Sequence, residues 1–81
     1  MMNMNWININ ERLPETPHRF GWMYESDPVL VWTENGYKVS VFSKRHRMNR
    51  DGELILEKEI WNEGSPVLYW MELPKPPTNE K

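Results

Sequence analysis

An Asn35-Gly36 pair between two runs of strand-forming residues is the feature that most limits what this chain can fold into. The runs, residues 29–33 and 38–42, read Val-Leu-Val-Trp-Thr and Lys-Val-Ser-Val-Phe. Asn-Gly accepts the positive φ angles of a two-residue type I′ turn, which joins adjacent antiparallel strands. The spacing therefore predicts a β-hairpin in which Glu34 lies opposite Tyr37.

This predicted turn also sets the register of the hairpin and, with it, the buried face. In this register Trp32 faces Val39. Leu30 faces Val41 on the same side, so that side is apolar throughout, whereas the other side carries Ser40. We therefore assign the first side to the core and interpret Trp32 as a core residue rather than a platform for a ligand.

Two further segments have strand character. Residues 67–71 are apolar on both faces, as in a central strand. Residues 53–61 alternate imperfectly, and a short helix would also accommodate their apolar positions. Without a long helical pattern, the chain is expected to be mainly β, a small single-domain antiparallel sheet of three to four strands. Prolines near both ends predict N- and C-terminal straps.

The size and composition favour one small folded domain. The chain has 81 residues, of which 38% are hydrophobic and 12% aromatic, including five Trp. Each large ring buries about 150–250 Å², so a few of them supply much of the driving force that a core this small needs. We expect residues 1–81 to form one domain with an ordered core at about residues 6–77.

Several chemistries are disfavoured by the residues that the chain lacks. It has no Cys, and neither His18 nor His46 has a metal-ligand partner at the usual spacing, so we expect no metal and no cofactor. No Gly-x-Ser-x-Gly motif or phosphate-binding Gly-rich loop is present, so we expect no enzyme activity. No apolar run is long enough to span a membrane, and a cytoplasmic location is expected.

Four cationic residues fall within seven positions, although the net charge of the chain is −2. They are Lys44, Arg45, Arg47 and Arg50. In a loop after the hairpin they would offer several N–H groups to phosphate or carboxylate, and Arg does so with two parallel hydrogen bonds. The segment is therefore a candidate ligand-binding site. The alternative is a solvated loop beside a solvated strand.

Three aromatic residues, Phe20, Trp22 and Tyr24, gather in a segment bounded by Pro and Gly at residues 18–27. An apolar loop on a small domain either folds back as a lid on the core or stays exposed as a recognition surface. In the second case these side chains are candidate partner-binding residues, because Trp and Tyr are enriched at interface hot spots.

Four short stretches match the pattern of a known family. They are Trp6-Ile7, Glu11-Arg12-Leu13-Pro14, Val29-Leu30-Val31 and Tyr69-Trp70-Met71-Glu72-Leu73-Pro74-Lys75-Pro76-Pro77. With these stretches, residues 6–77 resemble the bacteriophage and prophage family known as domain of unknown function 551. The resemblance implies a small β domain without an assigned activity. It also implies that Trp6 and Trp70 fill the core and that Leu13-Pro14 and Leu73-Pro74 are rigid ends strapped over the sheet.

The chain departs from the family pattern at Tyr69 and Glu72, where the pattern has His and Pro. The aromatic segment resembles an insertion, and the basic segment has no counterpart in the pattern. We therefore expect a non-catalytic phage accessory protein in the bacterial host cytoplasm, acting in counter-defence by sequestering an anionic, nucleotide-like ligand. One alternative is an inhibitor that binds a host defence protein through its aromatic loop. An RNA-binding module is a third reading, disfavoured by the acidic net charge. An exposed edge strand favours a homodimer or higher oligomer.

Overall fold

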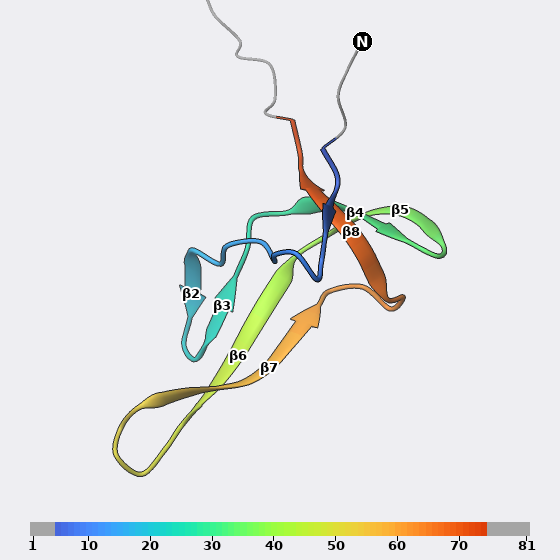
Figure 1. Ribbon diagram of the computed structural model, residues 1–81. Coiled ribbons are helices and arrows are strands. Elements are labelled where there is room, and N and C mark those ends of the chain that lie inside the picture. The colour runs from blue at the N-terminus through green and yellow to red at the C-terminus, as the bar shows by residue number, and fades with distance from the viewer. Residues whose placement is uncertain (1–4, 75–81) are drawn as a thin grey trace, which may run out of the picture.

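The chain folds into two four-stranded antiparallel sheets, as the computed structural model shows for residues 5–74 (Figure 1). The strands are β1 (Ile7–Asn8), β2 (His18–Phe20), β3 (Met23–Glu25), β4 (Val29–Thr33), β5 (Gly36–Ser40), β6 (Phe42–Met48), β7 (Leu54–Trp61) and β8 (Val67–Glu72). The expected antiparallel, mainly β class is confirmed, with two sheets where one was expected. Residues 5–74 contain no helix that could cross a membrane.

The first sheet has the order β1-β8-β4-β5 and carries most of the core on one face. Its buried apolar side chains are Val29, Val31, Val67 and Trp70, and Ile7, Ile9 and Trp61 pack against them. Strand β8 lies between β1 and β4, as its apolar sequence predicted. Trp70 is only 2% exposed, which confirms it as a core residue.

The predicted register of the β4–β5 hairpin is wrong. Thr33 pairs with Gly36, so the turn residues are Glu34 and Asn35. The Thr33 hydroxyl accepts the Asn35 N–H and donates to the Gly36 carbonyl, each at 3.0 Å, and so holds the turn one residue earlier than expected. Gly36 takes the positive φ, at 103°, whereas a type I′ turn here would require positive φ at Glu34 and Asn35.

The buried face of the hairpin is also the one opposite to our assignment. Val29, Val31 and Thr33 point into the core, while Trp32 faces Tyr37 and is 37% exposed. The prediction of Trp32 as a core residue is therefore wrong. Trp6, expected to fill the core, is only partly buried and instead stacks on Tyr37.

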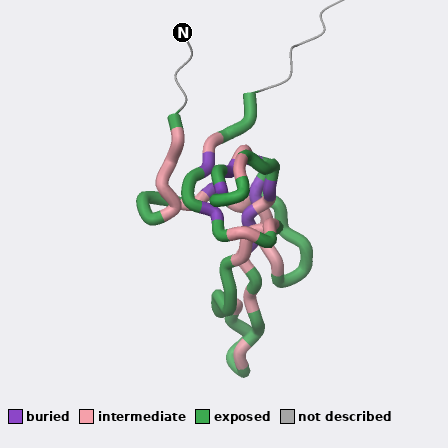
Figure 2. The backbone as a smooth tube through the Cα atoms, turned by 90° about the vertical axis from the view of Figure 1, so that its right-hand side faces the viewer, coloured by how far each residue is buried: buried purple, intermediate pink, exposed green. Residues whose placement is uncertain are grey.

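The second sheet has the order β2-β3-β6-β7, and the chain enters it from β5 after a single residue, Val41. Residues 54–61 are a strand, which settles the choice between strand and helix. Strands β6 and β7 extend beyond the other strands as a two-stranded arm (Figure 1). The buried residues gather in the body of the molecule, and the arm consists of intermediate and exposed residues (Figure 2).

Ser26, in the connection between β3 and β4, is hydrogen-bonded to Phe42, the first residue of β6. Its N–H donates to the Phe42 carbonyl at 2.8 Å, and its hydroxyl accepts the Phe42 N–H at 2.9 Å. Phe42 is 1% exposed and packs on Trp61, with ring centroids 5.0 Å apart. These contacts fix the start of β6 and hence the position of the side chains farther along it.

The N-terminal strap contacts the core through Pro14, which is buried, and through Arg12, whose carbonyl accepts the Trp70 indole N–H. On the C-terminal side, Leu73 and Pro74 follow β8 and are exposed. The rest of the expected C-terminal strap, from Lys75 to Pro77, lies outside the described residues.

Candidate functional site

An open pocket of about 390 Å³ lies where the β2–β3 hairpin meets the middle of β6. Aromatic and cationic side chains line it together, and we call it the hairpin pocket. Its lining residues are Phe20, Trp22, Met23, Arg45, His46, Arg47 and Glu57. The sequence placed the aromatic and the basic residues in two separate candidate sites, and the structure brings members of both into one.

The aromatic segment is a β-hairpin rather than a loop. Gly21 makes its turn with a φ of 63°, and the Arg19 Nε–H donates to the Gly21 carbonyl at 2.9 Å. The two aromatic side chains at the turn remain open to solvent, Phe20 at 62% and Trp22 at 50%. The hairpin therefore presents these rings instead of folding them over the core.

Hydrogen bonds attach the tip of this hairpin to β6. The His46 N–H donates to the Trp22 carbonyl at 2.8 Å, and the His46 ring Nδ1 lies 3.2 Å from the same oxygen. Strand pairing places Met23 opposite Arg45. The exposed indole is thus held at a fixed position next to the cationic side chains.

Arg45 and Arg47 lie on β6, where alternation of the strand places their side chains on the same face. The register shifts between Arg45 and His46, so Glu57 is the extra residue on β7. Arg45 pairs directly with Lys58, another cation, and like charges in opposite positions destabilise a sheet. Within residues 5–74, neither Arg45 nor Arg47 forms an ion pair with a carboxylate.

The remaining predicted site residues lie outside this pocket. The prediction of a basic loop is wrong, because residues 44–48 belong to β6 and their side chains alternate between its faces. Lys44 points to the other face, where it pairs with Glu59 and Tyr24. Tyr24 packs edge-on against His46, and Arg50 lies in the turn beyond β6.

The comparison with family models matches residues 5–78 to the family whose description reads "Protein of unknown function (DUF551)". The match covers nearly the whole chain. This chain belongs to that family. Comparison with curated proteins and with solved structures gave no match.

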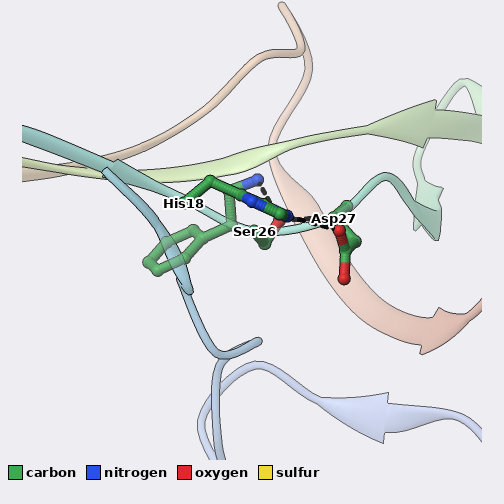
Figure 3. Close-up of polar contacts among 4 residues, drawn as sticks. His18, Ser26 and Asp27 are labelled. Carbon is green, nitrogen blue, oxygen red and sulfur yellow. Dashed lines mark hydrogen bonds and ion pairs between the residues drawn. The ribbon is translucent and has the colours of Figure 1, made fainter. Parts of the chain in front are cut away.

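A second polar cluster of this DUF551 chain lies at the start of β2, where the His18 Nε2 is 2.6 Å from the Asp27 Oδ1 (Figure 3). The neighbouring Ser26 hydroxyl donates to the Asp27 main-chain carbonyl at 2.7 Å and accepts the Phe42 N–H. Its only proton is thus directed to the backbone and not to the imidazole. The cluster joins the ends of β2 and β3 and does not form a Ser-His-Asp relay.

Another cavity, of about 420 Å³, lies beside the N-terminal strap. Its charged lining residues have both signs, with Arg12 near Glu15, Asp27 and Glu72. The Arg12 guanidinium is already placed over the Trp70 ring, 5.3 Å from its centroid. The acidic residues of this cavity outnumber its one Arg, so it does not favour an anionic ligand. No group of three or more His, Cys, Asp or Glu in residues 5–74 has a metal-binding arrangement.

The sequence analysis missed a second aromatic site of this DUF551 chain, on the first sheet. Trp6, Trp32, Tyr37 and Tyr69 line an open pocket of about 250 Å³, which we call the outer aromatic pocket. Trp32 pairs with both Tyr37 and Tyr69, so the three rings follow one row across the sheet. The correct hairpin register would have placed Trp32 opposite Tyr37, and the assumed type I′ turn hid this pair. Tyr69 joins the row through the pairing of β4 with β8, for which the sequence carried no signal.

Proposed function

We propose that this protein is a non-catalytic binding module that holds an anionic ligand with a flat ring, such as a nucleotide, in the hairpin pocket. The observation that carries the proposal is the meeting of Trp22 and Phe20 with Arg45 and Arg47 around one pocket. Aromatic rings stack on the π-face of any base, and guanidinium groups bind phosphate through paired N–H donors. The pocket offers both kinds of contact to one small molecule.

The charges around the pocket support an anion rather than a neutral ligand. Arg45 and Lys58 are opposite each other, and both arginines lack a carboxylate partner among the described residues. An incoming phosphate would relieve this repulsion and fill the unused N–H donors. Glu57 is the one acidic lining residue, so the cationic side chains outnumber it.

Binding without a chemical step implies a stoichiometric role. A small protein that takes up a nucleotide-like molecule lowers its free concentration, and the phage setting implied by the sequence resemblance makes counter-defence by sequestration a fitting use. The pocket is open rather than enclosed, which suits a ligand whose sugar or further phosphates remain partly in solvent.

Calorimetric titration of the purified protein with a panel of mono-, di- and cyclic nucleotides tests this proposal. The double variant Arg45→Ser/Arg47→Ser should lose at least tenfold in affinity for the nucleotide that the wild type binds, since each charge-assisted contact contributes about 1.5–3 kcal/mol. Lys44→Ser/Arg50→Ser is the matched control, because it removes the same charge from positions outside the pocket and should retain most of the affinity. Equal losses in both variants, or a wild type that binds no nucleotide of the panel, would exclude the proposed site.

A host protein is a second candidate partner, and the exposure of Phe20 and Trp22 at the hairpin tip favours it. Large, rigid aromatic side chains often anchor protein interfaces. Added salt separates the two candidates, because ligand binding through two guanidinium groups weakens with ionic strength, whereas apolar anchoring by these rings does not.

A further inference from the structure

The outer aromatic pocket is built from rings that no part of the described chain covers. Trp6 stacks on Tyr37 with ring centroids 5.9 Å apart and an interplanar angle of 16°. Trp32 meets the same Tyr37 edge-on, at 4.9 Å and 61°. Tyr69, from the central strand β8, completes the lining.

This pocket lies on an unusually apolar exposed surface. Tyr37 is 62% exposed, and Val39, two residues along the same edge strand, is 60% exposed. Trp32 and Tyr69 are also exposed by more than a third. Within residues 5–74, the indole N–H of Trp32 and the hydroxyls of Tyr37 and Tyr69 form none of the side-chain hydrogen bonds.

The chemistry of such a pocket fits a proline-rich segment. Grooves lined by Trp and Tyr bind extended proline-rich peptides, whose backbone has no internal hydrogen bonds and offers its carbonyls to indole and phenol donors. The chain itself contains one such segment, since residues 73–77 read Leu-Pro-Lys-Pro-Pro. Its Lys75 adds a cation that aromatic faces attract.

The position of this segment points to a second copy as its source. It follows directly after β8, the strand that carries Tyr69. Leu73, Lys75 and Pro76 each precede a proline, and a residue before proline favours extended over helical backbone, so the sequence favours a segment that continues away from β8. Reaching back over Tyr69 of its own chain would require a sharp reversal, whereas reaching another molecule would not.

We propose that residues 73–77 of one copy lie across the outer aromatic pocket of a second copy, and that the exchange is reciprocal in a two-fold dimer. A two-fold contact uses the same patch twice, so each copy supplies one groove and one segment. The proposal is independent of the hairpin pocket, which lies on the other sheet.

Sedimentation of the full chain over a range of concentrations tests the proposal with one variant on each side of the contact. Pro76→Ser/Pro77→Ser alters the segment, and Tyr37→Ser alters the pocket at an exposed edge-strand position. Each should weaken wild-type dimerisation at least tenfold. At a concentration where variant and wild type are both monomeric, their thermal midpoints should agree, since dimerisation itself stabilises the folded state. Met48→Ser is the control, because Met48 is a 41% exposed apolar residue at the far end of β6 and should dimerise as the wild type does.

Mixing the two variants separates exchange between copies from other arrangements. The segment variant keeps an intact pocket and the pocket variant keeps an intact segment, so the mixture should form a heterodimer although neither variant self-associates. A synthetic peptide of residues 72–78 should bind the segment variant, change its Trp fluorescence and compete with the heterodimer. A monomeric wild type, a dimer that tolerates both variants, or a mixture that stays monomeric would each overturn the proposal.

Discussion

The indole Nε1–H of Trp70 donates to the main-chain carbonyl of Arg12 at 2.9 Å, and the Arg12 guanidinium lies 5.3 Å from the centroid of the same ring. One side chain thus fills the core and also holds a segment that lies 58 positions earlier in the sequence. A chain of this size has few buried side chains, so such a residue contributes a large share of the stability.

We expect Trp70→Ala to lower the free energy of unfolding by about 3–5 kcal/mol, as the loss of a buried aromatic side chain does. Trp70→Phe keeps most of the apolar volume and removes the hydrogen bond, so its smaller cost measures the attachment of the strap. Urea denaturation followed by circular dichroism gives both values. A midpoint of Trp70→Ala close to that of the wild type would show that the ring is not part of the core.

Ser26 and Ser40 allow a matched test of buried hydroxyl groups. Both are buried, at 4% and 3% exposure, but Ser26 accepts the Phe42 N–H whereas the Ser40 hydroxyl has no partner in the described part of the chain. Ser26→Ala should cost about 1–3 kcal/mol, because it leaves a buried N–H unsatisfied. Ser40→Ala should be neutral or stabilising. Equal effects on urea midpoints would mean that the Ser26 hydrogen bonds do not hold the start of β6.

The hairpin shows which part of this fold the sequence predicts. Alternating β-branched residues around Asn35-Gly36 were enough to place the two strands. The register depends on a side-chain hydroxyl, Thr33, that captures the turn one residue earlier, and strand propensity carries no information on that contact. The shift changes which residues lie opposite each other but leaves Trp32 and Val39 on one face, so it does not explain the error in the buried face. That face was assigned to the core because it is the more apolar one, whereas the core lies on the opposite face, where Val31 pairs with the buried Trp70 of β8.

The candidate site was predicted by residue type but not by arrangement. Clusters of aromatic and basic residues were visible in the sequence, and four of these residues line the hairpin pocket. Their meeting depends on the pairing of β3 with β6, which joins segments about twenty residues apart. Lys44 and Tyr24 pair with each other and do not line the hairpin pocket, although the sequence placed them in the candidate sites with the other residues.

Gly36 provides a third test, at the turn that sets the register. Its φ of 103° is rarely adopted by residues with a side chain, although a Cβ there would meet nothing within 4 Å. Gly36→Ala should therefore destabilise the protein through backbone strain alone, by about 1 kcal/mol or more. Gly64→Ala is the control, since Gly64 has open space and no positive φ. Thermal melts of the two variants should differ, and equal midpoints would contradict the turn described here.

The last prediction separates the aromatic from the ionic part of the hairpin pocket. Trp22 is half exposed at the hairpin tip, and the tip is held by the main-chain carbonyl of Trp22 rather than by its ring. Trp22→Ala should therefore leave the thermal midpoint nearly unchanged, while nucleotide affinity falls by the value of one base stack, about 1–3 kcal/mol. Calorimetric titrations at several salt concentrations give the second readout. Trp22→Ala should keep the salt dependence of the wild type, because Arg45 and Arg47 remain, whereas Arg45→Ser/Arg47→Ser should flatten it. A cooperative loss of folding in Trp22→Ala would instead make the indole a structural element, and the stacking role would be excluded.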